Sequence, residues 1–134
     1  MESLGCGHIG VAVDCSGSIG DKELQIWCSE LNHIFSQCKP TKVTVCYFDT
    51  KIHVVEFDEL PIKLDAKGMG GGTHFNAPID FFNDEVEEEI TGLIFMTDMY
   101  GDWPEEPQYP VCVLSTTPNM DAPYGKTIYC DFTE

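Results

Sequence analysis

Short hydrophobic runs alternate along this chain with segments in which hydrophobic residues recur every three or four positions. The runs are apolar and rich in β-branched residues, as expected of strands buried on both faces, whereas the recurring spacing is typical of amphipathic helices. The helical spacing extends from Leu24 to Cys38 and again from Phe75 to Val86. The predicted strands cover residues 8–14, 42–49, 52–57, 92–98, 110–115 and 125–132.

The connections between these elements predict how the strands pair. Only Thr50 and Lys51 separate the second strand from the third, which is too short for a crossover helix and predicts an antiparallel hairpin. Helices between the other strands predict parallel pairing, and the segment 60–67 has room for one short edge strand. We predict a single α/β domain over residues 1–134. Its sheet is doubly wound and mostly parallel, with one antiparallel edge strand and helices on both faces.

The composition excludes several classes of function. The chain has 7 Lys and Arg against 23 Asp and Glu, so its formal net charge is −16, the opposite of what a nucleic-acid binder or a protein held on an anionic membrane needs. No apolar run approaches the roughly 18 residues of a membrane span. The 7 cysteines include no CxxC pair, which predicts buried thiols in a reducing compartment. We therefore expect a cytoplasmic protein.

Oxygen-bearing side chains follow the predicted strands at one edge of the sheet. Asp14 ends the first strand and is followed by Ser16 and Ser18, while Asp98 ends the strand at 92–98. A glycine-rich segment, 68–72, leads to Thr73 and allows its backbone to approach closely. Carboxylates and hydroxyls without nitrogen or sulfur suit Mg²⁺ or Mn²⁺. The sequence predicts a metal site formed by Asp14, Ser16, Ser18, Thr73 and Asp98.

The charge of this ligand set suggests what it binds. Two carboxylates and three hydroxyls around a divalent cation leave the site near neutrality, so the ion can accept a further oxygen from a Glu or Asp of a partner protein. His74, Asp102 and Trp103 lie close in sequence to the ligands and are candidate partner contacts. The alternatives are a solvated histidine and a tryptophan that packs its loop onto the sheet.

The same residues resemble the von Willebrand factor A (VWA) domain family over nearly the whole chain. The segment VAVDCSGS, 11–18, is similar to the family's Asp-x-Ser-x-Ser element, Thr73 in GGGTHF to its threonine, and IFMTD, 94–98, to its strand-ending aspartate. The resemblance implies a metal-ion-dependent adhesion site (MIDAS) on these residues. It also implies a role in protein interaction.

Two further segments resemble a narrower bacterial and phage group, the VWA-like domains at the C-terminus of metallopeptidase-related proteins. They are MTDMYGDWPEEPQYPVCVL, 96–114, and APYGKTI, 122–128. Relatives in this group often occur beside MoxR-type AAA+ ATPases, which implies an adaptor role toward such an ATPase. The first strand here begins close to Met1 and the chain has no HExxH motif, so peptidase activity is not implied.

Two other functions stay open as alternatives. The net charge of −16 would suit an acidic protein that mimics DNA and inhibits a DNA-binding protein. A metal-assisted phosphohydrolase is conceivable because a cation with open positions polarises phosphoryl oxygens. No base is placed to activate Ser16 or Ser18, and no catalytic residue is predicted, so we expect the protein not to be an enzyme.

Overall fold

The computed structural model describes residues 7–15, 21–48, 52–59, 62–64, 75–84, 90–97, 103, 105–107, 109–115 and 121–129. In chain order its elements are β1 (His8–Asp14), α1 (Asp21–Cys38), β2 (Lys42–Phe48), β3 (Ile52–Phe57), α2 (Asn76–Asp84), β4 (Gly92–Thr97), β5 (Val111–Ser115) and β6 (Lys126–Tyr129). The predicted order of strands and helices is confirmed. Neither of these two helices has the length and hydrophobicity needed to cross a membrane.

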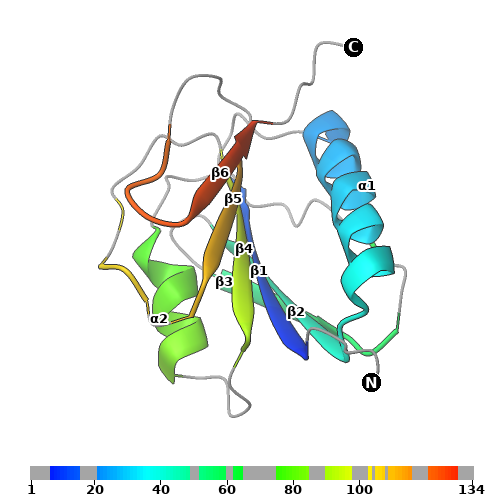
Figure 1. Ribbon diagram of the computed structural model, residues 1–134, viewed down its shortest axis with the longest axis horizontal. Coiled ribbons are helices and arrows are strands. Elements are labelled where there is room, and N and C mark those ends of the chain that lie inside the picture. Colours follow the sequence, from blue (N-terminus) through cyan, green and yellow to red (C-terminus); the bar gives the residue numbers. More distant parts are fainter. Residues whose placement is uncertain are drawn as a thin grey trace.

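The six strands form one sheet in the order β3-β2-β1-β4-β5-β6 (Figure 1). β1 pairs in parallel with both β2 and β4, and the parallel pairing continues through β5 to β6. β3 pairs antiparallel with β2 and forms one edge, as the short connection predicted. From β1 the chain builds one half of the sheet and then returns to build the other half. The junction between the halves therefore lies between β1 and β4, where sheets of this kind bind ligands.

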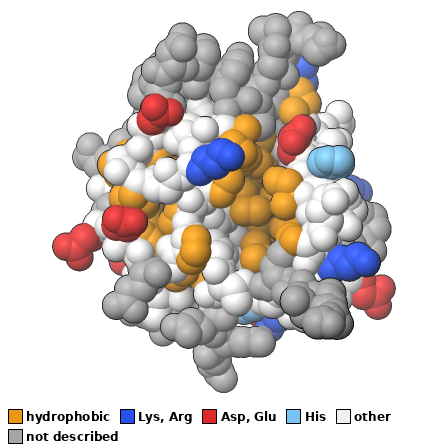
Figure 2. All heavy atoms as spheres, in the orientation of Figure 1, with side chains coloured by type: hydrophobic (Ala, Val, Ile, Leu, Met, Phe, Trp, Pro, Cys, Tyr) orange, Lys and Arg blue, Asp and Glu red, His pale blue; other side chains and the backbone are white. Residues whose placement is uncertain are grey.

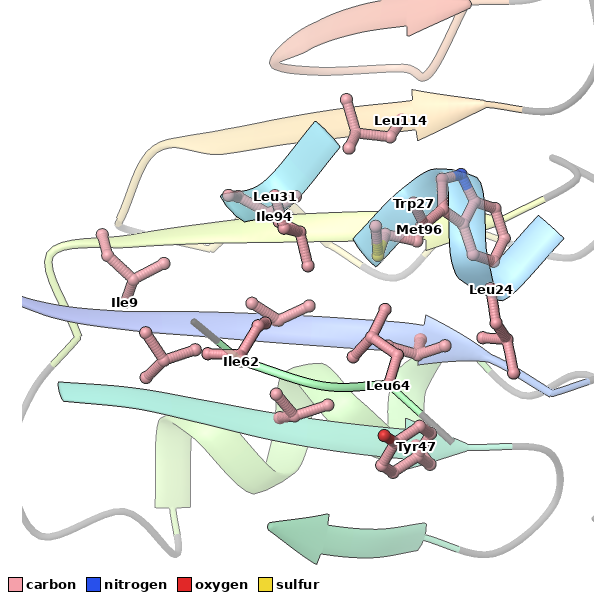
Figure 3. Packing of buried hydrophobic residues seen from close by; sticks show 14 of the residues in the cluster. Ile9, Leu24, Trp27, Leu31, Tyr47, Ile62, Leu64, Ile94, Met96 and Leu114 are labelled. Carbon is pink, nitrogen blue, oxygen red and sulfur yellow. The ribbon is translucent and has the colours of Figure 1, made fainter. Parts of the chain in front are cut away.

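One helix covers each face of the sheet (Figure 1). α1 buries Trp27, Leu31 and Phe35 in a cluster that includes Val11 and other β-strand residues, shown at close range in Figure 3. α2 buries a second cluster on the opposite face, in which its side chains meet those of β1, β2, β4 and β5. Because successive side chains of β1 enter alternate clusters, the strand is buried throughout. This two-sided burial is the physical reason for its uninterrupted hydrophobic run.

The segment at 60–67 contains no strand in its described part, residues 62–64. Instead, Ile62 and Leu64 are buried in the cluster beneath α1, where Figure 3 shows them beside the sheet. The Asn32 side chain of α1 holds this segment: its Nδ2 donates to the Ile62 carbonyl at 3.0 Å, and its Oδ1 accepts from the Ile62 amide at 2.9 Å. The helix thus satisfies backbone groups that a strand would have paired with the sheet.

The turn into β6 depends on glycine at position 125, which yields a first prediction. Gly125 has φ +76°, and a Cβ there would lie 2.3 Å from the Val111 carbonyl oxygen. We expect Gly125→Ala to lower the melting temperature by about 10 °C, because the strained backbone and the clash together cost about 2–3 kcal/mol. Thermal unfolding followed by circular dichroism measures this shift.

Gly92→Ala is the matched control for that variant. Gly92 begins β4, and its added Cβ would come no nearer than 3.6 Å to the Pro110 carbonyl oxygen, an ordinary contact. We expect its melting temperature to change by only a few degrees. Equal losses in both variants would show that neither the positive φ of Gly125 nor the clash with the Val111 carbonyl oxygen causes the loss of stability.

Candidate functional site

Asp14 is the described residue at the centre of the predicted metal site. It is the last residue of β1 and its side chain is fully buried. In the parallel register it pairs with Phe48, whose carbonyl accepts a hydrogen bond of 2.8 Å from the amide of Cys15. The hydrogen bonding between β1 and β2 therefore extends one residue beyond Asp14. This fixes its backbone at the carboxyl edge of the sheet, at the junction between β1 and β4.

A threonine on the neighbouring strand fixes the Asp14 side chain. Thr97 ends β4 and is fully buried, and its Oγ1 donates to Asp14 Oδ2 over 2.8 Å. The parallel register pairs Val13 with Met96, so Asp14 and Thr97 lie next to each other at the ends of their strands. Hydrogen bonds to an ionised carboxylate are shorter and stronger than neutral ones. One carboxylate oxygen is thus engaged within the protein, and the orientation of the group is set.

A third buried polar side chain continues this row. Ser115 ends β5, pairs with Thr97 in the parallel register and is fully buried. Asp14, Thr97 and Ser115 thus end three adjacent parallel strands with buried polar groups. Burying polar groups costs free energy unless they find partners. The row therefore brings groups that need polar partners to the carboxyl edge of the sheet, where the predicted metal site lies.

Thr97 is the residue that the sequence analysis missed. The only local signal was its position directly before Asp98, in a strand otherwise made of apolar residues. Its hydroxyl could equally have formed a hydrogen bond with a backbone group of its own strand. That it reaches Asp14 follows from the β1–β4 register, which joins residues more than 80 positions apart.

Six of the predicted site residues lie outside the described residues: Ser16, Ser18, Thr73, His74, Asp98 and Asp102. The described chain reaches close to each of them. Asp98 follows Thr97 directly, and Ser16 follows Cys15. The structure therefore places the ends of the segments that carry them, and their roles as ligands or partner contacts stay predictions.

Phe75 brings the end of the glycine-rich segment to the same edge of the sheet. It lies two residues after Thr73 and is 1% exposed. Its ring packs edge-on against Phe48, with 6.0 Å between ring centroids, and against Phe95 at 5.1 Å. Phe48 is the register partner of Asp14. The chain that carries Thr73 thus arrives beside the strand end next to Asp14.

Trp103 packs onto the sheet, the alternative that the sequence left open beside partner contact. Its ring centroid lies 4.7 Å from that of Phe75 and 5.1 Å from that of Phe95. A further edge-on contact joins it to Tyr124 at 5.9 Å. The side chain is half-buried, so it anchors the loop that leaves β4. A contact between Trp103 and a partner stays a prediction.

The thiols near this edge are poor candidates for metal ligands. Cys15 and Cys46 are buried and are not in a disulfide, and burial, with a smaller effect from Cys15, raises the pKa of Cys46 to about 12. A thiol with such a pKa stays protonated at neutral pH, whereas a metal needs the thiolate. Across the described ranges, no group of three His, Cys, Asp or Glu side chains could hold a metal ion. Of the predicted ligands, only Asp14 belongs to those ranges.

Comparison with known proteins identifies the fold. The family described as "VWA-like domain (DUF2201)" matches residues 9–131. No curated protein sequence matches significantly. The structure is similar to the ArnB paralog VWA2 from Sulfolobus acidocaldarius, with a TM-score of 0.60 and 16% identity over 85% of this chain and 36% of that one.

A second similar structure is an aerotolerance-related membrane protein from Bacteroides fragilis NCTC 9343, solved with multiple mutations to serines. Its TM-score is 0.52 and its identity 17%, over 81% of this chain and 66% of that one. The present chain therefore spans less than two thirds of the length of either protein. At these identities the likeness is one of fold.

Proposed function

The chain belongs to the VWA-like domain family, and from this premise we propose that it binds Mg²⁺ or Mn²⁺ at the β1–β4 edge and engages an acidic residue of a partner protein. A role in protein interaction is what the family implies. The observation that supports the finer proposal is the buried Asp14 carboxylate, held by Thr97 at the junction of the two half-sheets. A cation bound at that point would compensate the negative charge of the carboxylate.

The donor set fits a small hard cation. The Asp14 carboxylate would bind the ion directly or through a water. Ser16, Ser18 and Thr73 would contribute neutral hydroxyl oxygens, and Asp98 a second negative charge. Octahedral cations such as Mg²⁺ bind few protein carboxylates and retain waters. The bound ion would supply a positive charge with an exchangeable position, to which a partner's Glu or Asp binds.

The partner is proposed by class. An acidic side chain fits because the ligand set carries about two negative charges and so leaves the cation site near neutrality. A MoxR-type AAA+ ATPase is a candidate, for which the chain would act as an adaptor. This candidate rests on the resemblance of residues 96–114 and 122–128. We propose no catalytic residue, and a metal-assisted phosphohydrolase stays the weaker alternative.

The DNA-mimic alternative makes a specific demand on the arrangement of the acidic side chains. A mimic needs carboxylates arrayed over one face to match the spacing of phosphates. On the face shown in Figure 2, the described acidic side chains are separate from one another and hydrophobic side chains gather at the centre. The acidic side chains that the structure describes on this face therefore form no continuous array.

Chelation and salt separate the two functions in one experiment. The purified chain is titrated with MgCl₂ and MnCl₂ while its melting temperature is recorded, and partner capture from a lysate is repeated with EDTA or with added NaCl. At a cation concentration 100 times its dissociation constant we expect a rise of about 10 °C. Capture should be lost in EDTA. If the amount of captured partner is unchanged by EDTA but falls steeply with added NaCl, the result would support the DNA mimic and overturn our proposal.

A further inference from the structure

Residues 62–64, which we call the strap, lie across the α1 face of the sheet without belonging to it. Ile62 and Leu64 are buried in the cluster beneath α1, and Lys63 between them is exposed. This alternation is typical of an extended segment with one side against a core. Among the described residues, however, no strand pairs with the strap and no backbone-to-backbone hydrogen bond reaches it.

Two side chains of α1 hold the backbone of the strap at Ile62. The Asn32 side-chain amide binds both polar backbone groups of this residue, its carbonyl at 3.0 Å and its amide at 2.9 Å. The Cys28 thiol, one helical turn earlier, donates to the same carbonyl at 3.4 Å. Removing the Asn32 side chain would therefore break two of the three hydrogen bonds that join the strap to α1.

The sheet beneath the strap is held by many more hydrogen bonds. β1 pairs along its whole length with β2 and pairs with β4 on its other side. A segment with few backbone hydrogen bonds opens at a lower free energy than the paired strands of a core. The strap can therefore leave the α1 face while the sheet stays intact.

The strap also precedes part of the predicted metal site. Figure 3 shows Leu64 nearer than Ile62 to the carboxyl end of β1, where Asp14 lies. Thr73, a predicted ligand, comes nine residues after Leu64 in the sequence. A closed strap fixes one end of this length of chain, so less conformational freedom is lost when Thr73 binds a cation.

We propose that the strap opens as a unit while the sheet stays folded, and that a cation bound at the Asp14 edge holds the strap closed. The second statement rests on the proposed function, whereas the first does not. Coupling between two equilibria is reciprocal, so a closed strap strengthens cation binding as much as the cation favours the closed strap. The strap thereby regulates the proposed cation site.

The reactivity of Cys28 measures strap opening, because the Ile62 carbonyl contacts its thiol in the closed form. The folded full chain is treated with iodoacetamide at increasing low concentrations of urea, and peptide mass spectrometry follows alkylation at Cys28 and Cys46. Cys46 is buried in β2 and reports opening of the sheet. The rate at Cys28 should change little with urea, whereas the rate at Cys46 should rise steeply. The same urea dependence at both thiols would overturn the strap as a separate unit.

Asn32→Ala should speed the alkylation of Cys28 about 30-fold, which corresponds to about 2 kcal/mol for the two lost hydrogen bonds. Ser36→Ala is the matched control, since its hydroxyl lies on the same helix but donates to the His33 carbonyl. Its rate should equal that of the wild type. Equal rates in Asn32→Ala and wild type would overturn the proposal. If Asn32→Ala does not fold, the urea dependence of the wild type decides.

A cation tests the second statement on the same samples. MgCl₂ at about 100 times its dissociation constant should slow the alkylation of Cys28 about 100-fold when the ion binds only the closed form. The melting temperature is recorded in parallel. A raised melting temperature with an unchanged rate at Cys28 would overturn the coupling and leave the proposed function standing. No change in either quantity would overturn the proposed function and the coupling with it.

Discussion

Asp14→Asn is expected to abolish the stabilisation of this domain by Mg²⁺ and Mn²⁺. Asparagine keeps the size of the side chain and an oxygen that accepts from Thr97 Oγ1, but it removes the negative charge. Two unit charges about 4 Å apart interact by about 4 kcal/mol at an effective dielectric constant of 20, and the double charge of Mg²⁺ increases this. We expect cation binding to weaken at least about 100-fold, or about 2.7 kcal/mol. Thermal shift and calorimetric titration with MgCl₂ measure the loss.

The metal-free protein provides the first control on this result. Because the substitution removes a buried charge and keeps its hydrogen bond, the metal-free melting temperature should stay level or rise. Asp58→Asn, the same chemical change at an exposed position after β3, should leave the cation response intact. A cation-induced shift of equal size in Asp14→Asn and wild type would show that Asp14 is not a ligand.

Thr97→Val is expected to weaken Mg²⁺ binding and to shift cation preference toward Ca²⁺. Valine has nearly the same shape as threonine but cannot donate to Asp14 Oδ2. With that oxygen released, the carboxylate can offer both oxygens to one ion, a geometry that Ca²⁺ accepts and Mg²⁺ avoids. Losing a charge-assisted hydrogen bond should cost about 1.5 kcal/mol, which is about a tenfold weaker affinity for Mg²⁺. Calorimetric titration with each cation gives the ratio.

Thr97→Ser is the matched variant, since it retains the hydroxyl and removes only a methyl group. It should keep the wild-type ratio of Mg²⁺ to Ca²⁺ affinity. The ratio separates a positioning role from a general loss of stability, which would weaken both cations together. If Thr97→Val and Thr97→Ser give the same ratio as wild type, the hydrogen bond does not select the cation. That outcome would leave the role of Asp14 untouched.

Most of the fold followed from local patterns in the sequence. The predicted strands at 8–14 and 52–57 are β1 and β3 to the residue, and the two-residue connection correctly predicted the antiparallel edge. These predictions succeeded because a strand buried on both faces must be apolar along its whole length. The possible edge strand at 60–67 is not found in the described part of that segment, because its buried residues belong to a stretch held by the Asn32 side chain of α1.

The cysteines show a similar limit of local reasoning. Their odd number and the absence of a CxxC pair indicated thiols without disulfides, which is correct for four of the described cysteines. The disulfide-bonded state of Cys38 is revealed by no spacing along the chain. Pairing of thiols depends on distance in space.

The sequence by itself determined the order of the elements, the edge of the sheet that carries the candidate ligands, and the carboxylate at the end of β1. Each of these depends on periodicity and on residue type, which are local properties of the chain. Only the tertiary structure decided that Thr97 holds Asp14, that Phe75 and Trp103 pack together, and that Cys38 is bonded. These contacts join residues far apart in the chain, and they arise from strand register and core packing.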